Sequence, residues 1–153
     1  MEILSSLLGE LEFDESFIIS FPQGIPAFEE EKKFVLLPMD GNGPFYYLQS
    51  VKNPDLCLLV AEPFTFFPDY EIDINDEYLK TLGIKEEEQQ MSIYLILTVP
   101  EDFKMTTANL IAPLVINTDN RQGIQYIAAK TNYTTRHHIF RPEQKTASGG
   151  EGR

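Results

Sequence analysis

The sequence predicts an all-β domain, a small closed or partly open β-barrel with one or two short helices. The apolar segments are short and rich in β-branched and aromatic residues, as is typical of strands. Pro, Gly, Asn and Asp separate them at short intervals, and only one stretch has clear helical spacing. With 153 residues and 42% hydrophobic content, the chain can bury roughly two-thirds of its unfolded surface in one core.

Nine segments are predicted to be strands. In chain order they are residues 9–13, 17–21, 34–38, 45–51, 56–61, 70–74, 91–99, 110–117 and 124–129. Residues 22–24 (PQG) and 40–44 (DGNGP) have the composition of turns between strands. Residues 91–99 are apolar on both faces over their second half, which predicts a central strand covered on both sides.

One helix is predicted between residues 75 and 83. Asn75 or Asp76 can cap its first turn, and Gly83 can end it in a left-handed conformation. Three residues at spacings of three and four form its expected inward stripe: Tyr78, Leu79 and Leu82. Residues 85–90 are expected to form a polar turn or a second short helix.

A single domain is expected over residues 1–142. Residues 143–153 have little to bury, so we expect a flexible tail or an expression remnant. No apolar run approaches the roughly 18 residues of a membrane helix, and the first residues lack the basic leader of a signal peptide. With Cys57 as the single cysteine, these features predict a cytoplasmic protein.

Residues that commonly carry catalysis or bind metals are scarce. Cys57 lies in an apolar run and is expected to be a buried, unreactive thiol. His137 and His138 are adjacent, so in an extended segment they point in opposite directions and form a poor metal pair. The sequence has no glycine-rich phosphate loop and no nucleophile elbow. Many carboxylates are present, but nothing marks two of them as an acid/base pair. We therefore expect no enzyme and no cofactor.

Acidic residues are concentrated in two blocks. The first 31 residues hold eight carboxylates and no Lys or Arg, and residues 62–88 hold nine more against two lysines. The net charge is −12, although the stretch from Asn120 onward contains six Lys or Arg and only two Glu. Such a surface repels nucleic-acid phosphates and attracts basic partners. The alternative is that the acidity serves only solubility.

Three stretches are more specific than a generic β pattern. They are residues 21–29 (FPQGIPAFE), residues 47–51 followed by 61–64 and 67–71, and residues 107–117 (TANLIAPLVIN). In order and spacing these stretches resemble the flagellar assembly factor FliW family, and the likeness runs from about Phe13 to Pro142. Ala27 is a departure, since the family commonly has Gly at this point of the turn.

The resemblance implies a barrel-like regulator that acts by binding. FliW-family proteins bind CsrA, an RNA-binding translational regulator, and prevent it from repressing flagellin mRNA. They also bind flagellin, so that CsrA and flagellin alternate as partners. An acidic protein docked beside the RNA-binding surface of a basic regulator would lower its RNA affinity without occupying the RNA site. A non-competitive, partly electrostatic block is therefore the expected mechanism.

The expected contact surface centres on residues 62–73. Its aromatic residues can anchor an interface, and strand alternation would place Glu71 and Asp73 opposite Tyr70 and Ile72. The candidate partner-binding residues are Glu71, Asp73, Asp69, Glu62, Phe64 and Tyr70, together with Glu29 and Glu30 after the first turn. The alternative is that Phe64, Phe66 and Phe67 are core residues and the acids are solvated.

Other residues in the matched stretches are expected to be structural. Pro22, Gly24 and Pro26 set turn geometry. Four more residues are expected to bond to backbone polar groups left unpaired by the irregular chain, or to shape that chain: Gln49, Ser50, Asn109 and Pro113.

Two other functional classes stay open at this stage. One is a barrel that holds a small molecule, such as a cation or a sugar, in its mouth or lumen. A filled barrel interior would oppose that class. The other is a hydrolase, which needs two carboxylates about 5–10 Å apart across a cleft.

Overall fold

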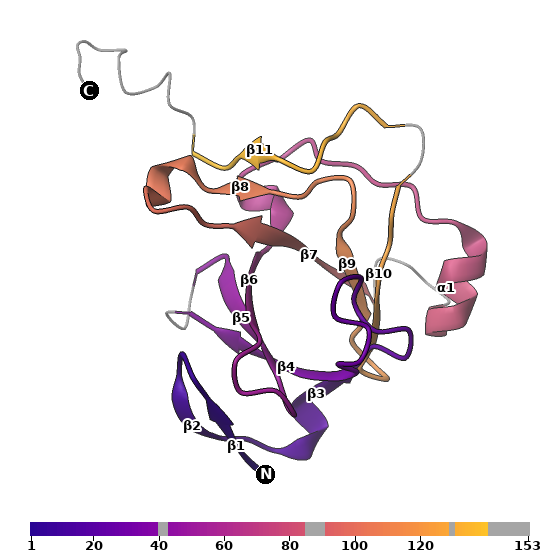
Figure 1. Ribbon diagram of the computed structural model, residues 1–153. Helices are drawn as coiled ribbons and strands as arrows, with labels where there is room; N and C mark the ends of the chain where they lie inside the picture. The colour runs from indigo at the N-terminus through magenta and orange to yellow at the C-terminus, as the bar shows by residue number, and fades with distance from the viewer. Residues whose placement is uncertain (40–42, 85–90, 129–130, 141–153) are drawn as a thin grey trace.

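Seven strands close into a barrel in the computed structural model, which describes residues 1–39, 43–84, 91–128 and 131–140 (Figure 1). The strands are β1 (Glu2–Ser5), β2 (Gly9–Glu12), β3 (Ile18–Ser20), β4 (Lys33–Pro38), β5 (Phe45–Ser50), β6 (Cys57–Ala61), β7 (Met91–Thr98), β8 (Thr107–Ala108), β9 (Leu114–Asn117), β10 (Gln122–Gln125) and β11 (His137–His138). The helical elements are α1 (Asp76–Leu82) and the 3₁₀ turns η1 (Glu15–Phe17), η2 (Pro63–Thr65) and η3 (Phe103–Met105). The expected class, an all-β barrel with a short helix, is confirmed.

The barrel runs in the order β3-β4-β5-β6-β7-β9-β10. Its neighbouring strands are antiparallel, except that β10 pairs in parallel with β3 and so closes the ring. The end of β7 leaves the barrel and pairs with β8, which in turn pairs with β11. This small sheet lies across the top of the barrel in Figure 1.

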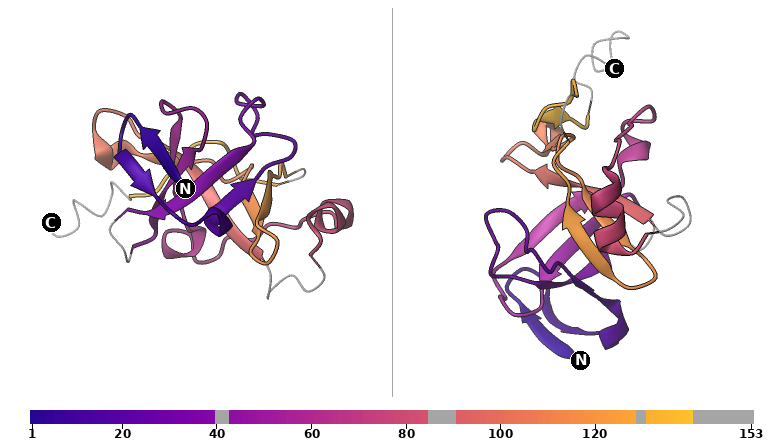
Figure 2. Two further views of the ribbon diagram at one scale, coloured as in Figure 1. Left: turned by 90° about the horizontal axis from the view of Figure 1, so that it is seen from below. Right: turned by 90° about the vertical axis from the view of Figure 1, so that its right-hand side faces the viewer.

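The first two strands form a separate hairpin at the lower end of the molecule as drawn in Figure 1, and the view from below shows it facing the reader (Figure 2, left). A buried hydrogen bond from Ser5 Oγ to Gln49 Oε1 (2.7 Å) ties it to β5. The amide of Gln49 also donates to the carbonyls of Ser50 and Asn53. The expectation that Gln49 satisfies irregular backbone is confirmed.

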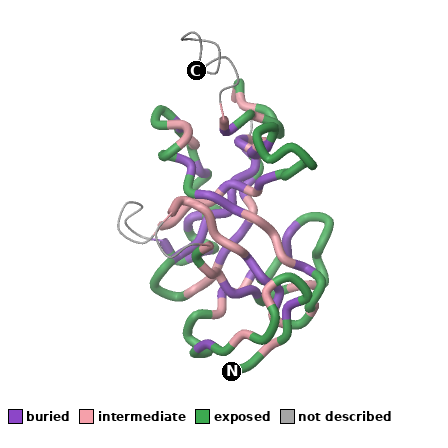
Figure 3. The backbone as a smooth tube through the Cα atoms, turned by 90° about the vertical axis from the view of Figure 1, so that its left-hand side faces the viewer, coloured by how far each residue is buried: buried purple, intermediate pink, exposed green. Residues whose placement is uncertain are grey.

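Apolar side chains fill the barrel interior. The central cluster consists of Ile19, Phe21, Ile25, Phe34, Leu48, Leu56, Val60, Leu114 and Ile116, all of them buried. Phe21 and Phe34 pack edge to face at 5.6 Å, and a Cβ at Gly123 would lie 2.8 Å from the Phe21 ring. Figure 3 shows the buried stretches running along the barrel strands. A filled interior opposes the alternative of a ligand held in the lumen.

The helix α1 forms where the sequence predicts it. Asn75 Oδ1 accepts a hydrogen bond from the N–H of Glu77 (2.7 Å), and Gly83 follows the helix with φ +74°. Leu79 and Leu82 are buried in the cluster that covers β9 and β10, beside which α1 stands (Figure 2, right). Tyr78 is 40% exposed, so it is not the inward residue that the spacing predicts.

The Tyr78 ring instead lies against that of Tyr126, with 5.0 Å between the ring centroids. The prediction for residues 85–90 falls outside the described residues.

One strand prediction is wrong and two are correct only in part. Residues 70–74 do not form a strand. The predicted strand 110–117 is regular only at β9, and the predicted strand 124–129 is regular only at its first two residues, which end β10. Between β8 and β9 the chain is irregular, and Asn109 Oδ1 accepts from the N–H groups of Ile111 and Ala112 (3.2 and 3.1 Å). The strands β1, β8 and β11 have no counterpart in the sequence-based prediction.

Candidate functional site

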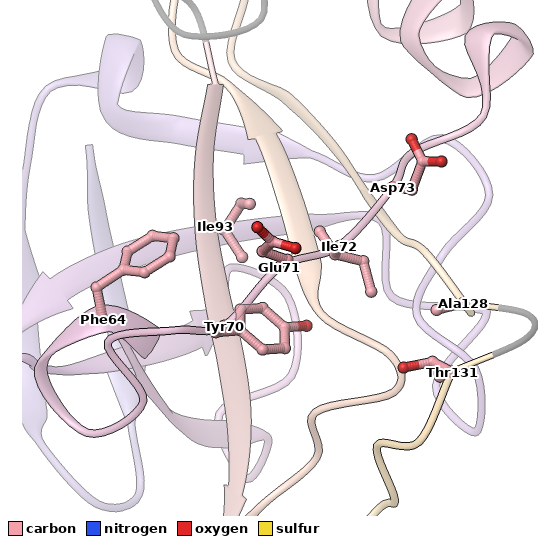
Figure 4. Close-up of a pocket in the computed structure, with 8 residues that line it drawn as sticks. All are labelled: Phe64, Tyr70, Glu71, Ile72, Asp73, Ile93, Ala128 and Thr131. Carbon is pink, nitrogen blue, oxygen red and sulfur yellow. The ribbon is translucent and has the colours of Figure 1, made fainter.

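An open groove of about 630 Å³ lies on the outside of β7. Its lining residues are Phe64, Tyr70, Glu71, Ile72, Asp73, Ile93, Ala128 and Thr131 (Figure 4). We call it the acidic groove, because Glu71 and Asp73 are the two charged residues among the eight described residues that line it. Its apolar lining comes mainly from Ile72, Ile93 and Phe64.

Residues 70–74, which run along the acidic groove, keep the burial alternation of a strand without strand pairing. Tyr70 and Ile74 are buried, and Glu71 and Asp73 between them are exposed. The sequence-based placement of the two carboxylates opposite the buried residues is therefore correct, although the predicted strand is absent. Both carboxylates are available to a partner in solution.

Tyrosine hydroxyls from the C-terminal part of the chain hold the backbone of this segment in place. The Tyr133 hydroxyl accepts from the N–H of Glu71 (3.0 Å). The Tyr126 hydroxyl donates to the carbonyl of Asp73 (3.0 Å) and accepts from the N–H of Asn75 (3.3 Å). These bonds fix the direction in which the acidic side chains project.

Tyr70 is the buried wall of the acidic groove. Its hydroxyl donates to the carbonyl of Leu110 (2.7 Å), and burial raises its pKa well above the ordinary tyrosine value. The ring lies 4.9 Å from that of Tyr133 and 6.4 Å from that of Phe64, measured between centroids. Because the side chain is only 4% exposed, it shapes the groove more than it offers contact area.

The phenylalanines of the predicted surface divide into two kinds. Phe66 and Phe67 are half-buried and pack against the cluster formed by Leu95, Leu97 and their neighbours. Phe64 is 54% exposed at the edge of the acidic groove. The core alternative thus holds for Phe66 and Phe67, whereas Phe64 presents an aromatic face to solvent.

The other predicted site residues lie outside the acidic groove. The carboxylate of Glu62 accepts from the Tyr46 hydroxyl (2.8 Å), and this hydrogen bond is the main cause that raises the pKa of Tyr46 to about 12. Asp69 lines a smaller adjoining pocket. Glu29 and Glu30 are exposed in the connection between β3 and β4.

The structure thus brings together four of the predicted residues: Phe64, Tyr70, Glu71 and Asp73. Sequence reasoning missed Ile93, Ala128 and Thr131, which come from distant parts of the chain. It also missed the two tyrosines that hold the segment, Tyr126 and Tyr133. No local signal distinguishes these residues, because only the tertiary fold places them beside residues 70–74.

The described part of the chain shows no group of three or more His, Cys, Asp or Glu side chains that could hold a metal ion. Within that same part, no helix is long and apolar enough to cross a membrane. The groove combines an apolar lining with two projecting carboxylates. This combination suits a protein partner that presents both apolar and basic groups.

Comparison with known proteins gives one consistent family. A family model described as FliW protein matches residues 2–139. The chain is 55% identical over 150 residues to the flagellar assembly factor FliW of Syntrophomonas wolfei, covering 98% of this chain and 96% of that protein. It is 49% identical over 144 residues to the flagellar assembly factor FliW of Geobacillus sp. strain WCH70, covering 94% and 98% respectively.

A solved structure agrees with these relatives. A crystal structure of the flagellar assembly factor FliW superposes with a TM-score of 0.86 at 48% sequence identity, covering 92% of this chain and 98% of that one. The likenesses in sequence and in fold therefore each extend over nearly the whole chain.

Proposed function

The chain belongs to the FliW family, and from that premise we propose that it is a flagellar assembly factor that binds CsrA and antagonises its repression of flagellin mRNA. We propose that this antagonism is non-competitive with RNA and that flagellin is the alternative partner. We propose that the protein acts in the cytoplasm, where CsrA meets mRNA and where flagellin is made before its export. The role is one of binding, without catalysis.

The observation that carries this proposal is the acidic groove. It presents exposed Phe64 and the carboxylates of Glu71 and Asp73 on one surface of a protein with a net charge of −12. A regulator that holds RNA phosphates must be basic near its RNA path. Charge complementarity then speeds its encounter with the acidic groove, and Phe64 supplies an aromatic contact of the kind that anchors interfaces.

The same charge explains how RNA is released without direct competition. Carboxylates docked beside the RNA path repel phosphates, and like charges juxtaposed across an interface cost several kcal/mol. Screening restricts this effect to carboxylates within about 8 Å of the RNA at physiological salt. The partner switch follows if bound flagellin prevents CsrA from binding, so that export of flagellin frees the protein for CsrA.

Glu71→Lys tests the proposed contact. The variant reverses a charge at the middle of the acidic groove, and we expect it to abolish CsrA binding measured by isothermal titration calorimetry. The thermal melt should stay nearly unchanged, because the Glu71 side chain is exposed and makes no hydrogen bond or ion pair to another described residue.

Glu101→Lys is the matched control. It makes the same charge change at an exposed residue between β7 and β8, outside the acidic groove, and should bind CsrA nearly as wild type does. Equal binding by wild type and Glu71→Lys would move the contact surface elsewhere on the molecule. Wild-type protein that binds neither CsrA nor flagellin would overturn the proposed function itself.

A further inference from the structure

A smaller pocket of about 230 Å³ adjoins the acidic groove and shares Tyr70 with it. We call it the aromatic pocket. Its main lining residues are Phe67, Asp69, Tyr70, Leu110, Tyr133 and His137. Small-molecule sites usually measure roughly 300–1,000 Å³, so the size of this pocket suits a single side chain.

Four rings surround the aromatic pocket. The centroids of Tyr70 and Tyr133 are 4.9 Å apart, and that of His137 lies 6.1 Å from both Tyr133 and Phe67. The His137 ring is steeply inclined to both of its neighbours, at 75° and 81°. Aromatic rings attract a cation placed over their faces within about 6 Å of the centroid.

These rings are held before any ligand arrives. The Tyr70 hydroxyl is bonded to the carbonyl of Leu110, and the Tyr133 hydroxyl to the N–H of Glu71. His137 Nε2 accepts a hydrogen bond from the N–H of Thr134 (2.9 Å), which holds the ring in place. A site whose walls are already fixed loses less entropy when it binds.

Asp69 supplies the negative charge at the aromatic pocket. Its side chain is exposed, and among the described residues it has no hydrogen-bond or ion-pair partner. Among the described residues that line the pocket, none is Lys or Arg. A carboxylate beside aromatic rings favours a cation over an anion or a neutral group.

We propose that the aromatic pocket binds one cationic side chain, arginine or lysine, of a protein partner. The half-buried rings of Phe67, Tyr133 and His137 contact the guanidinium or ammonium group, and Asp69 pairs with its charge. Arginine is favoured, because its planar guanidinium can also stack on a ring. The partner's identity rests on the proposed function, in which a basic regulator docks at the adjoining acidic groove.

Titration of the full chain with two short peptides, followed by ¹H–¹⁵N NMR, tests this site. The probes are acetyl-Gly-Arg-Gly-amide and the same peptide with citrulline, which keeps the shape of arginine without its charge. The arginine peptide should shift the amides of Phe67, Asp69 and His137. The citrulline peptide should bind at least about fivefold more weakly.

Two variants and one control complete the test. Asp69→Asn and Phe67→Leu should each weaken binding of the arginine peptide by about twofold to fivefold. Glu101→Gln, which removes an exposed charge outside the aromatic pocket, should leave the binding unchanged. Equal binding of the two peptides, or shifts that bypass these residues, would overturn the inference.

Failure of this inference is distinguishable from failure of the proposed function. Wild-type protein that binds CsrA but shows no response to the arginine peptide would remove the cation site and leave the proposed function standing. Wild-type protein that binds the peptide as described, but neither CsrA nor flagellin, would overturn the proposed function and leave the cation site standing.

Discussion

Ala27 occupies a backbone conformation that suits glycine. Its φ is +78°, and the N–H of Phe28 donates to the carbonyl of Ile25 (2.7 Å) across the turn. Pro26 followed by a residue with positive φ matches a type II turn, which favours Gly at the third position. The turn thus has a glycine-like conformation with alanine at its third position.

Ala27→Gly should therefore stabilise the protein. A left-handed conformation costs a non-glycine residue roughly 1–2 kcal/mol, and the greater flexibility of unfolded glycine offsets part of that gain. We expect the free energy of unfolding to rise by about 0.5–1 kcal/mol, measured by urea denaturation. Ala27→Val should lower it, because β-branched residues tolerate positive φ poorly. A loss of stability in the glycine variant would contradict this account.

Buried and hydrogen-bonded tyrosines predict a loss of stability in alkali. The hydrogen bond to Glu62 raises the pKa of Tyr46 to about 12 from 10.0, and burial raises the pKa of Tyr70 and Tyr94. A folded-state pKa above the unfolded value means that the folded state favours the protonated phenol. The stabilisation is then complete below pH 10 and is lost as the pH rises through the folded-state values.

Urea midpoints measured from pH 8 to 12 should fall above about pH 10, together with an absorbance rise at 295 nm as the phenols ionise. Tyr70→Phe should make the fall in the urea midpoint smaller, because it removes one of the tyrosines whose pKa is raised. Midpoints that stay constant across this range would contradict the assignment.

At the scale of elements, the helix α1 depends on the residue that ends it. Gly83 has φ +74°, and a Cβ there would lie 3.3 Å from Asn120 Nδ2. That amide donates to the carbonyl of Leu82 (3.0 Å), so it also holds the helix end. The opposite end of α1 begins at Asn75, directly after the segment that lines the acidic groove.

Gly83→Ala should accordingly lower the free energy of unfolding by about 1–2 kcal/mol, through the left-handed φ and the close approach to Asn120. Lys80→Ala, at an exposed position inside the same helix, should be nearly neutral. Chemical denaturation followed by circular dichroism would measure both variants. A neutral Gly83→Ala would show that the helix end adjusts without strain.

Elements also show what the sequence could and could not predict. Alternation of apolar and polar residues reports burial, so the exposure of Glu71 and Asp73 was predicted correctly. It does not report hydrogen-bond partners, and so it predicts a strand at residues 70–74 that does not form. The strands β8 and β11 have two residues each, too few to leave a periodic pattern.

The same limit applies to the candidate site, because sequence patterns find only residues that are close along the chain. Phe64, Tyr70, Glu71 and Asp73 are close in sequence, so composition could find them together. Ala128 and Thr131 follow β10 in the sequence, and they lie beside residues 70–73 only because the folded barrel brings the two segments together.

At the scale of the whole molecule, the acidic groove and the aromatic pocket lie on the outside of a filled barrel. The acidic groove and the aromatic pocket are both built from the segments that cover β7 and from the C-terminal part of the chain. Carboxylates dominate the net charge of −12. A docked partner therefore meets the acidic groove together with those other carboxylates that lie within about a Debye length of it.

Salt should therefore weaken the release of RNA from the proposed partner. Raising the salt from about 0.1 M to about 1 M shortens the Debye length from about 10 Å to about 3 Å, which screens carboxylates beside the RNA path.

The measurement is the fluorescence anisotropy of labelled RNA on CsrA, with and without saturating amounts of this protein. Each reading is corrected for the direct effect of salt on the two separate binding reactions. The corrected loss of RNA affinity should shrink as salt rises. A corrected loss that is the same at every salt concentration would instead indicate a purely conformational block, in which the carboxylates serve docking alone.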